Sequence, residues 1–172
     1  MTINKVMKFQ TNIPIKKSDF LIDYSSKLVS LGSCFAENMG NKFDYFKFST
    51  ITNPFGIIFN PISLETIILR SIHKKYFTEK DIFFHNEAWH CFEVHSELSN
   101  PDKTEFLTTL NQLIDTTNWH LEKATHCLIT LGTSWVYKHI ETNDIVANCH
   151  KVPQKQFVKE LLSVADIEAS LK

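Results

Sequence analysis

The chain has 172 residues and a mass of 20.0 kDa, which predicts a single domain, residues 1–172, large enough to bury a core of its own. Hydrophobic residues make up 43% of the chain and charged residues 22%, a globular composition that argues against disorder. The 18 basic and 19 acidic side chains give a net charge of −1, which leaves no overall positive field to hold a nucleic acid.

The sequence lacks the patterns of an exported or membrane protein. Residues 1–17 have scattered lysines but neither an apolar core nor a small-residue cleavage site, so we do not expect a secretory signal. The apolar run at residues 55–59 is far shorter than the ~20 residues that cross a bilayer. The cysteines occur singly, so we expect free thiols and a cytoplasmic protein, with two disulfides as the alternative if a leader precedes this sequence. They are Cys34, Cys91, Cys127 and Cys149.

The first predicted elements are a strand, a tight turn and a helix. Residues 27–31 form a strand-like run that ends at Gly32-Ser33, and residues 34–46 then change to a helical period. Ser33 stands at the junction, where a serine is also a good N-cap. One apolar stripe along this helix is predicted to face the core, and its members are Phe35, Met39, Phe43 and Phe46.

Two more strands and a helix are predicted next. Residues 46–51 form a second strand-like run, and Asn53-Pro-Phe-Gly56 has the residue order of a type I turn. Residues 57–59 are a short third candidate strand. Asn60-Pro61 then supplies an N-cap and a first-turn proline for a helix.

The second half of the chain is predicted to contain two hairpins, two helices and one buried strand. The hairpins are residues 82–94, turning at Asn86-Glu87, and residues 135–147. One helix begins after Asn100-Pro101, and the other spans residues 154–165. Residues 126–131 are nearly all apolar, which is typical of a parallel strand covered on both faces.

Alternating strands and helices predict an α/β fold, in three α/β/α layers around a mainly parallel sheet. Ligands of such folds bind beyond the carboxyl ends of the strands. Three turns are expected at that edge, and they are Gly32-Ser33, residues 53–56 and residues 132–134.

Ser33 is a candidate nucleophile because of its position. A hydroxyl between a strand and a helix lies at the rim of the sheet, beside free N–H groups that can stabilise an oxyanion. A serine also needs a base, since its own pKa is too high for it to ionise. The alternative interpretation is a plain N-cap.

Four sequence blocks resemble the GSCFA family, which is grouped with the SGNH or GDSL-like hydrolases. The resemblance runs from about residue 28 to about residue 153. It implies an α/β/α fold in which a serine, a glycine, an asparagine and a histidine come from separate blocks. The four blocks are Leu31–Asn38, Asn53–Gly56 with Asn60-Pro61, Thr130–Trp135 and Asn148–Lys151.

The resemblance assigns roles position by position. Ser33 resembles the nucleophile, with its own N–H as one oxyanion donor, and Gly56 resembles the second block's glycine, which offers another N–H. Ser134 stands where most SGNH enzymes have an asparagine, so Asn148 is a candidate substitute for that donor. The implied substrate is an acyl ester of a small molecule or a carbohydrate.

The general base is the point at which the sequence departs from the SGNH pattern. Those enzymes keep Asp-x-x-His near the carboxyl end, and no histidine follows His150 here. The resemblance implies that the chain is the amino-terminal portion of a longer GSCFA protein, in which case residues beyond 172 supply the Asp and His, or else a fragment or degenerate copy that lacks them. We expect weak or no activity from this chain alone. His150 is the internal candidate base, with a role in pinning its own loop as the alternative. A non-catalytic module that binds a small polar ligand or a glycan is the alternative function.

Other chemistries have little support in the sequence. No Gly-x-Gly-x-x-Gly occurs, so we expect no nucleotide cofactor. His85, His90 and His95 are spaced by five residues, whereas zinc ligands prefer gaps of about two to four, so we expect no metal. His95–Glu97 lies in a stretch that GSCFA proteins share, which implies either a cleft wall or a structural loop. Cys34 is predicted to pack under the sheet.

Overall fold

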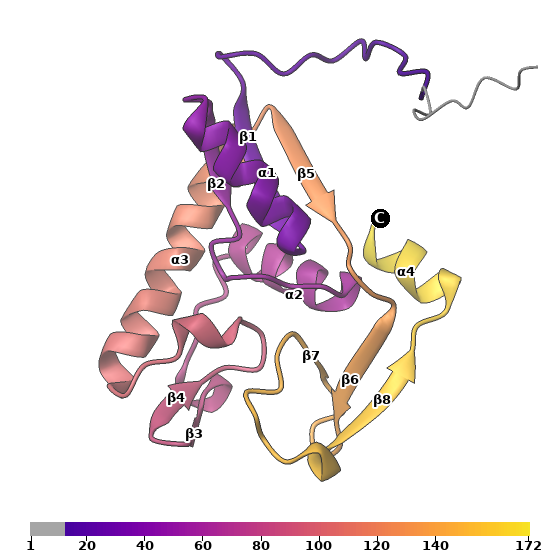
Figure 1. The fold of residues 1–172 in the computed structure, drawn as a ribbon. Coiled ribbons are helices and arrows are strands. Elements are labelled where there is room, and N and C mark those ends of the chain that lie inside the picture. The colour runs from indigo at the N-terminus through magenta and orange to yellow at the C-terminus, as the bar shows by residue number, and fades with distance from the viewer. Residues whose placement is uncertain (1–12) are drawn as a thin grey trace, which may run out of the picture.

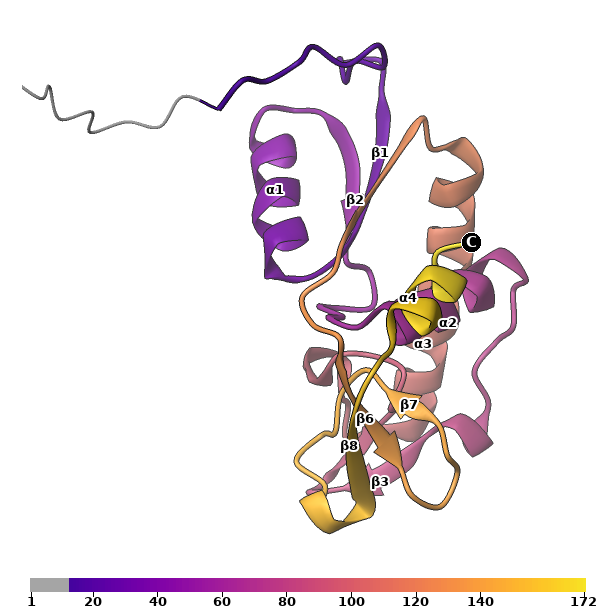
Figure 2. The same cartoon turned by 90° about the vertical axis from the view of Figure 1, so that its right-hand side faces the viewer.

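A computed structural model describes residues 13–172 (Figure 1). None of the helices in this part of the chain combines the length and the apolar composition that a membrane crossing requires. The parallel strands lie at one end of the molecule, and the hairpins lie at the other (Figures 1 and 2). In chain order the strands and helices are β1 (Lys27–Gly32), α1 (Cys34–Tyr45), β2 (Ser49–Thr52), α2 (Pro61–Ile72), β3 (Phe83–His85), β4 (Ala88–His90), α3 (Lys103–Lys123), β5 (His126–Thr130), β6 (Trp135–His139), β7 (Ile145–Val146), β8 (Phe157–Leu161) and α4 (Val164–Ser170).

Two three-stranded sheets and one hairpin organise these strands. The first sheet has the order β2-β1-β5 and is parallel throughout. The second has the order β7-β6-β8 and is antiparallel, and β3 pairs with β4 as a separate hairpin. The predicted mixed α/β class with a parallel sheet is confirmed.

Strand β1 is the centre of the parallel sheet because it pairs with both β2 and β5. Helix α1 lies on one face of this strand, and α3 lies on the other (Figure 2). Successive side chains of a strand point to opposite faces, so β1 contributes to both contacts. Val29 and Leu31 belong to the main core, together with the fully buried α3 residues Phe106, Leu110 and Ile114.

Helix α1 packs through small residues, which contradicts the predicted stripe. Ala36 and Gly40 are its buried residues, whereas Phe35 is 61% exposed and Phe46 is 55% exposed. The reason is the close approach of the helix to the sheet. A Cβ atom added to Gly40 would lie 2.0 Å from the Thr52 Oγ1 atom of β2, so a bulky side chain on this side would push the two apart.

Strand β5 is parallel to β1 as predicted, but the expectation that both its faces are buried was wrong. Cys127 is exposed and Ile129 is 44% exposed. In the described part of the chain β5 pairs with β1 alone, so it forms one edge of the sheet. The apolar sequence of β5 is typical of an interior strand, but its position at the edge of the sheet exposes part of that apolar surface.

Two predicted elements have a different form in the structure. Residues 57–59 form no strand and instead cross the end of the sheet as an extended segment. Residues 154–165 are not one helix, because Phe157–Leu161 pair with β6 as strand β8 and the helix begins at Val164. A helix of five residues has little stability of its own. The backbone hydrogen bonds that β6 offers in the folded protein therefore decide that this segment is a strand.

The turn and cap signals of the sequence are confirmed where they are purely local. Asn86 and Glu87 have φ values of 46° and 63° and turn the β3–β4 hairpin as predicted. Asn60 accepts a hydrogen bond from the Ser63 N–H and caps α2, with Pro61 in the first turn. The helix after Asn100-Pro101 begins at Lys103, because Asp102 is its cap.

We expect Gly40→Ala to destabilise the protein by about 1–3 kcal/mol, because the new methyl group overpacks the contact between α1 and Thr52. Intrinsic helix propensity alone predicts the opposite sign, a gain of about 1 kcal/mol. Urea unfolding followed by circular dichroism measures the difference. The matched control is Asn41→Ala, the next and exposed position of α1, which we expect to stabilise slightly. A stabilising Gly40→Ala would contradict this packing.

Candidate functional site at the carboxyl edge of the parallel sheet

The loops that follow β1, β2 and β5 meet at one edge of the parallel sheet, as predicted. The Gly32 N–H donates to the Asn53 Oδ1 atom at 2.8 Å, which joins the first two loops. The Ile58 N–H donates to the Gly32 carbonyl at 2.9 Å, and the Gly132 N–H donates to the Phe59 carbonyl at 2.9 Å. The extended segment 57–59 therefore ties the ends of β1 and β5 together.

Ser33 is the N-cap of α1 and is only 6% exposed. Its Oγ atom accepts a hydrogen bond from the Phe35 N–H at 3.3 Å and lies 2.9 Å from the Thr130 Oγ1 atom. The Ser33 N–H donates to both the carbonyl and the hydroxyl of Thr130, each at 3.0 Å. No histidine or carboxylate of the described residues is hydrogen-bonded to Ser33, so its use as a nucleophile stays a prediction.

Asn53 links the second loop to the first and was not singled out by the sequence. It is buried, and its φ of 41° lies in the left-handed region that asparagine tolerates. Besides accepting from Gly32, its side-chain amide donates to the Glu37 Oε2 atom at 2.9 Å, and its own N–H donates to the Ser30 carbonyl at 2.9 Å. Its place at the start of the Asn-Pro-Phe-Gly turn was the available signal.

Gly56 closes this turn and lies against the segment that contains His95. The Gly56 N–H donates to the Asn53 carbonyl at 2.7 Å, and its φ is +76°. An added Cβ atom would lie 2.2 Å from the Cβ of His95 and 2.7 Å from the Glu97 Oε1 atom. His95 and Glu97 are partly exposed, and the Nδ1 and Oε2 atoms of the two side chains are 3.5 Å apart. The side chains of His95 and Glu97 therefore pack against the second loop.

Ser134 and Asn148 make their contacts elsewhere. Ser134 precedes β6, and its carbonyl accepts the Leu162 N–H at 2.9 Å. Asn148 accepts the His150 N–H through its side chain at 2.8 Å. Neither side chain is hydrogen-bonded to Ser33 or Gly56, so their roles as oxyanion donors stay predictions.

His150 has both ring nitrogens occupied by other groups. Its Nε2 atom lies 2.7 Å from the Cys91 carbonyl, and its Nδ1 atom lies 3.1 Å from the Nδ1 atom of His90. The side chain is buried, and burial is the main cause that lowers the pKa of His150 to about 4. In this arrangement His150 does not reach Ser33, and its contacts pin the loop that contains it, which was the alternative interpretation of this residue.

Comparison with known proteins is informative at the level of the family. Residues 27–172 match the GSCFA family. The chain belongs to this family. The resemblance drawn from the four sequence blocks is thus confirmed, whereas no curated protein and no solved structure matches the chain.

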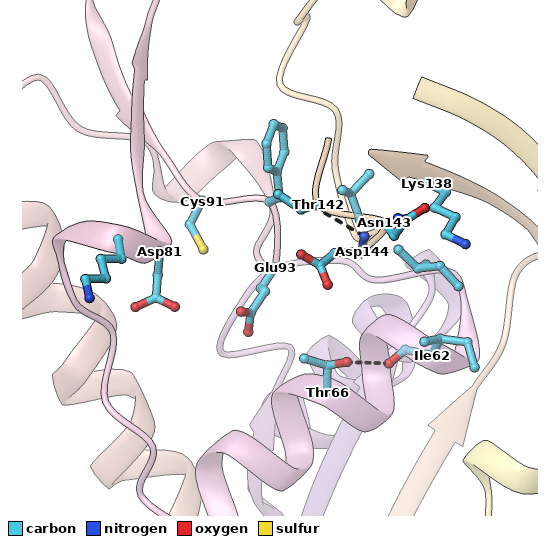
Figure 3. Close-up of a pocket in the computed structure, with 13 residues that line it drawn as sticks. Ile62, Thr66, Asp81, Cys91, Glu93, Lys138, Thr142, Asn143 and Asp144 are labelled. Carbon is cyan, nitrogen blue, oxygen red and sulfur yellow. Dashed lines mark hydrogen bonds between the residues drawn. The ribbon is translucent and has the colours of Figure 1, made fainter. Parts of the chain in front are cut away.

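A second region of the GSCFA chain contains a pocket of about 460 Å³ between α2, the residues around β4 and the β6–β7 turn (Figure 3). The carboxylates of Asp81, Glu93 and Asp144 line it, together with Lys138 and the hydroxyl of Thr66. Acidic and basic groups are thus mixed along its wall, with amide and hydroxyl groups between them.

Arg70 orients two of these carboxylates through hydrogen bonds from its guanidinium group. Its guanidinium is buried and donates to Glu93 through two nitrogens and to Asp81 at 3.2 Å, while it lies 4.2 Å from the ring centre of Phe77. Burial opposes the ionisation of Asp81, but bonds from Thr78 and the charge of Arg70 lower its pKa overall. The guanidinium therefore fixes the orientation of both carboxylates.

The cysteines of the chain differ in their exposure, and none of them forms a disulfide in the structure. All four cysteines are free, and burial raises the pKa of Cys91 to about 12, so this thiol stays protonated. Cys34 is exposed, so the prediction that it packs under the sheet was wrong; the buried face of α1 belongs to Ala36 and Gly40. Within residues 13–172 no group of three or more potential ligand side chains is arranged to hold a metal ion.

We expect Asn53→Ala to destabilise the protein by about 2–4 kcal/mol. The variant leaves the buried Gly32 N–H without an acceptor and places an alanine in the left-handed region. The matched control is Asn143→Ala, an exposed asparagine with a φ of 62°, which isolates the backbone cost of about 1 kcal/mol. Chemical denaturation measures both variants, and equal losses would show that the side-chain bonds of Asn53 contribute nothing.

Proposed function

We propose that this GSCFA protein is an SGNH-like serine hydrolase with a three-layer α/β/α fold that acts on acyl esters of small molecules or carbohydrates. One observation carries the proposal: the Ser33 hydroxyl lies at the N-terminus of α1, at the carboxyl edge of a parallel sheet, in hydrogen-bonded contact with the third block. The second block lies at the same edge through the bond from the Gly32 N–H to the Asn53 side chain. Substrates of α/β folds bind at this edge.

The reaction would begin with attack of the Ser33 Oγ atom on the carbonyl carbon of the ester. The bond to the leaving alcohol then breaks, and the proton of the hydroxyl passes by way of a base to the alkoxide. Water releases the acyl group in a second, equivalent step. The oxyanion would be held by the N–H groups of Ser33 and Gly56, with Ser134 or Asn148 as a further donor.

The resting arrangement accounts for the weak activity that we expect. The N–H groups of Ser33 and Gly56 already donate to Thr130 and Asn53, so they would have to be shared with an oxyanion. His150, the internal candidate base, bonds to His90 and Cys91 instead. A missing general base costs about 10²–10⁴-fold in rate.

A binding module without catalysis is the second candidate, and the pocket of Figure 3 favours it. Fixed carboxylates, hydroxyls and an amide at Asp81, Glu93, Thr66 and Asn143 can accept and donate several hydrogen bonds at once. A ligand with many hydroxyl groups, such as a glycan, matches that set. Volumes of about 300–1,000 Å³ are typical of small-ligand pockets.

Labelling by a fluorophosphonate probe tests the hydrolase. We expect the wild-type chain to react slowly, Ser33→Ala to lose the label completely, and Ser49→Ala, an exposed serine of β2, to keep it. Intact-mass spectrometry measures the adduct, and mass spectrometry of the digested protein locates the labelled serine. A folded wild-type chain that takes no label, or an adduct on another serine, would contradict Ser33 as the nucleophile.

Titration calorimetry with neutral oligosaccharides tests the binding module. We expect Asp144→Asn, which changes an exposed carboxylate of the pocket, to weaken binding about tenfold, since a hydrogen bond to a charged group contributes roughly 1.5–3 kcal/mol. Asp44→Asn on α1 is the matched control, because it removes an exposed carboxylate outside the pocket. Equal affinities for the two variants would contradict the interpretation of this pocket as a glycan-binding site.

A further inference from the structure

A second pocket, of about 310 Å³, contains donors but no carboxylate. His90 and His150 line it and are 8% and 4% exposed. They come from β4 and from the fourth sequence block, which are 60 residues apart in the chain. The other residues that line the pocket are Asn86, Ser96, Ser99, Asn148 and Lys151.

The hydrogen bonds of the two histidines determine where their protons lie. The Nε2 atom of His90 is 2.9 Å from the His85 carbonyl, and the Nε2 atom of His150 is 2.7 Å from the Cys91 carbonyl. A carbonyl oxygen only accepts, so each Nε2 atom must carry a proton. In a neutral imidazole of this tautomer the Nδ1 atom has a bare lone pair.

The two Nδ1 atoms face each other at 3.1 Å. Two bare lone pairs at this distance repel, whereas one added proton converts the contact into an N–H···N hydrogen bond. The Ser99 Oγ atom lies 2.6 Å from the Nδ1 atom of His90, where a hydroxyl can either accept this proton or donate its own. The contact between the two Nδ1 atoms is therefore a hydrogen bond only when one proton lies between them.

The surroundings limit the pair to one proton. Burial lowers the pKa of His150 to about 4, and the charge of His90 lowers it further against the opposing bond to Cys91. The other titratable groups that face the pair are His85, whose ring centre is 6.4 Å from that of His90, His95 and Lys151. Phe83 and Phe92 cover the remaining sides of the rings. Two groups that interact this closely titrate as a unit.

We propose that this pocket binds a small oxyanion, and that the single proton shared by His90 and His150 supplies part of the positive charge that holds it. Lys151 adds a second positive charge at the same pocket, and the hydroxyls of Ser96 and Ser99 and the amide of Asn148 add neutral donors. The absence of any acidic side chain from this lining distinguishes it from the pocket of Figure 3.

The loop that carries the pocket is held in its conformation by hydrogen bonds within the loop and to β4. His150 and Lys151 have φ values of 48° and 58°, and the bond from the His150 N–H to the Asn148 side chain stabilises that turn. The histidine pair then fastens the loop to β4. The oxyanion site does not depend on the proposed hydrolase activity of Ser33, because none of the residues that line it is hydrogen-bonded to that serine.

Calorimetric titration with sulfate tests the proposal, since sulfate keeps its charge across the pH range used. Above the pKa of the pair, binding must take up the shared proton, so we expect the affinity to fall about tenfold for each pH unit between pH 6 and 9.5 until the unprotonated site dominates. Titrations in buffers of different ionisation enthalpy should show uptake of close to one proton. Affinity that does not change with pH, or the absence of sulfate binding, would overturn the proposal.

Three variants separate the contributions. His150→Gln should abolish the pH dependence of sulfate binding, whereas His126→Gln, a histidine outside the pocket, should leave it unchanged. Lys151→Gln should weaken binding by a similar factor throughout the range below the pKa of lysine, because it removes a charge that does not titrate there.

Nitrogen NMR of the wild-type protein tests the proton arrangement even if a histidine variant fails to fold. In the sulfate-bound protein we expect both histidines to carry a proton on Nε2 and one proton to be shared between the two Nδ1 atoms. A histidine of the pair that carries its proton on Nδ1 and has none on Nε2 would overturn this assignment of the protons. So would tight binding of Zn²⁺ alone at the two Nδ1 atoms, which would make the pocket a metal site.

Discussion

Gly32 is held on both sides by hydrogen bonds, and the geometry of the whole sheet edge depends on them. Its N–H donates to the Asn53 side chain, and its carbonyl accepts from Ile58. A Cβ atom at this position would lie 2.0 Å from the Thr130 carbonyl, so the backbone of β1 approaches β5 as closely as a glycine allows. This contact places Ser33 at the start of α1 and brings the first three family blocks together.

The structure separates two kinds of chemistry that the sequence had combined in one site. The candidate nucleophile lies at the edge of the parallel sheet, while the fourth block, with Asn148 and His150, bonds to the β3–β4 hairpin and the residues that follow it. The buried pair explains the separation physically. A histidine whose two ring nitrogens both have close partners has little freedom to serve as a base for a distant hydroxyl.

Prediction from the sequence succeeded where the signal was local. The Asn60-Pro61 helix start and the Asn86-Glu87 turn each depend on one or two residues, and both formed as predicted. It failed where a tertiary contact decided between two plausible outcomes. The buried face of α1 follows Gly40 rather than its aromatic stripe, and residues 157–161 became a strand because β6 was available as a partner.

The sequence by itself determined the family, the parallel β1–α1 unit and the identity of the turns at the sheet edge, because each follows from residues that are neighbours in the chain. The tertiary structure alone decided that β5 is an edge strand, that Asn53 bonds to Gly32, and that His90 meets His150. The last two contacts join residues that are 21 and 60 positions apart. Such contacts form only when the chain closes long loops around a common core, and no local pattern records which of the possible closures will occur.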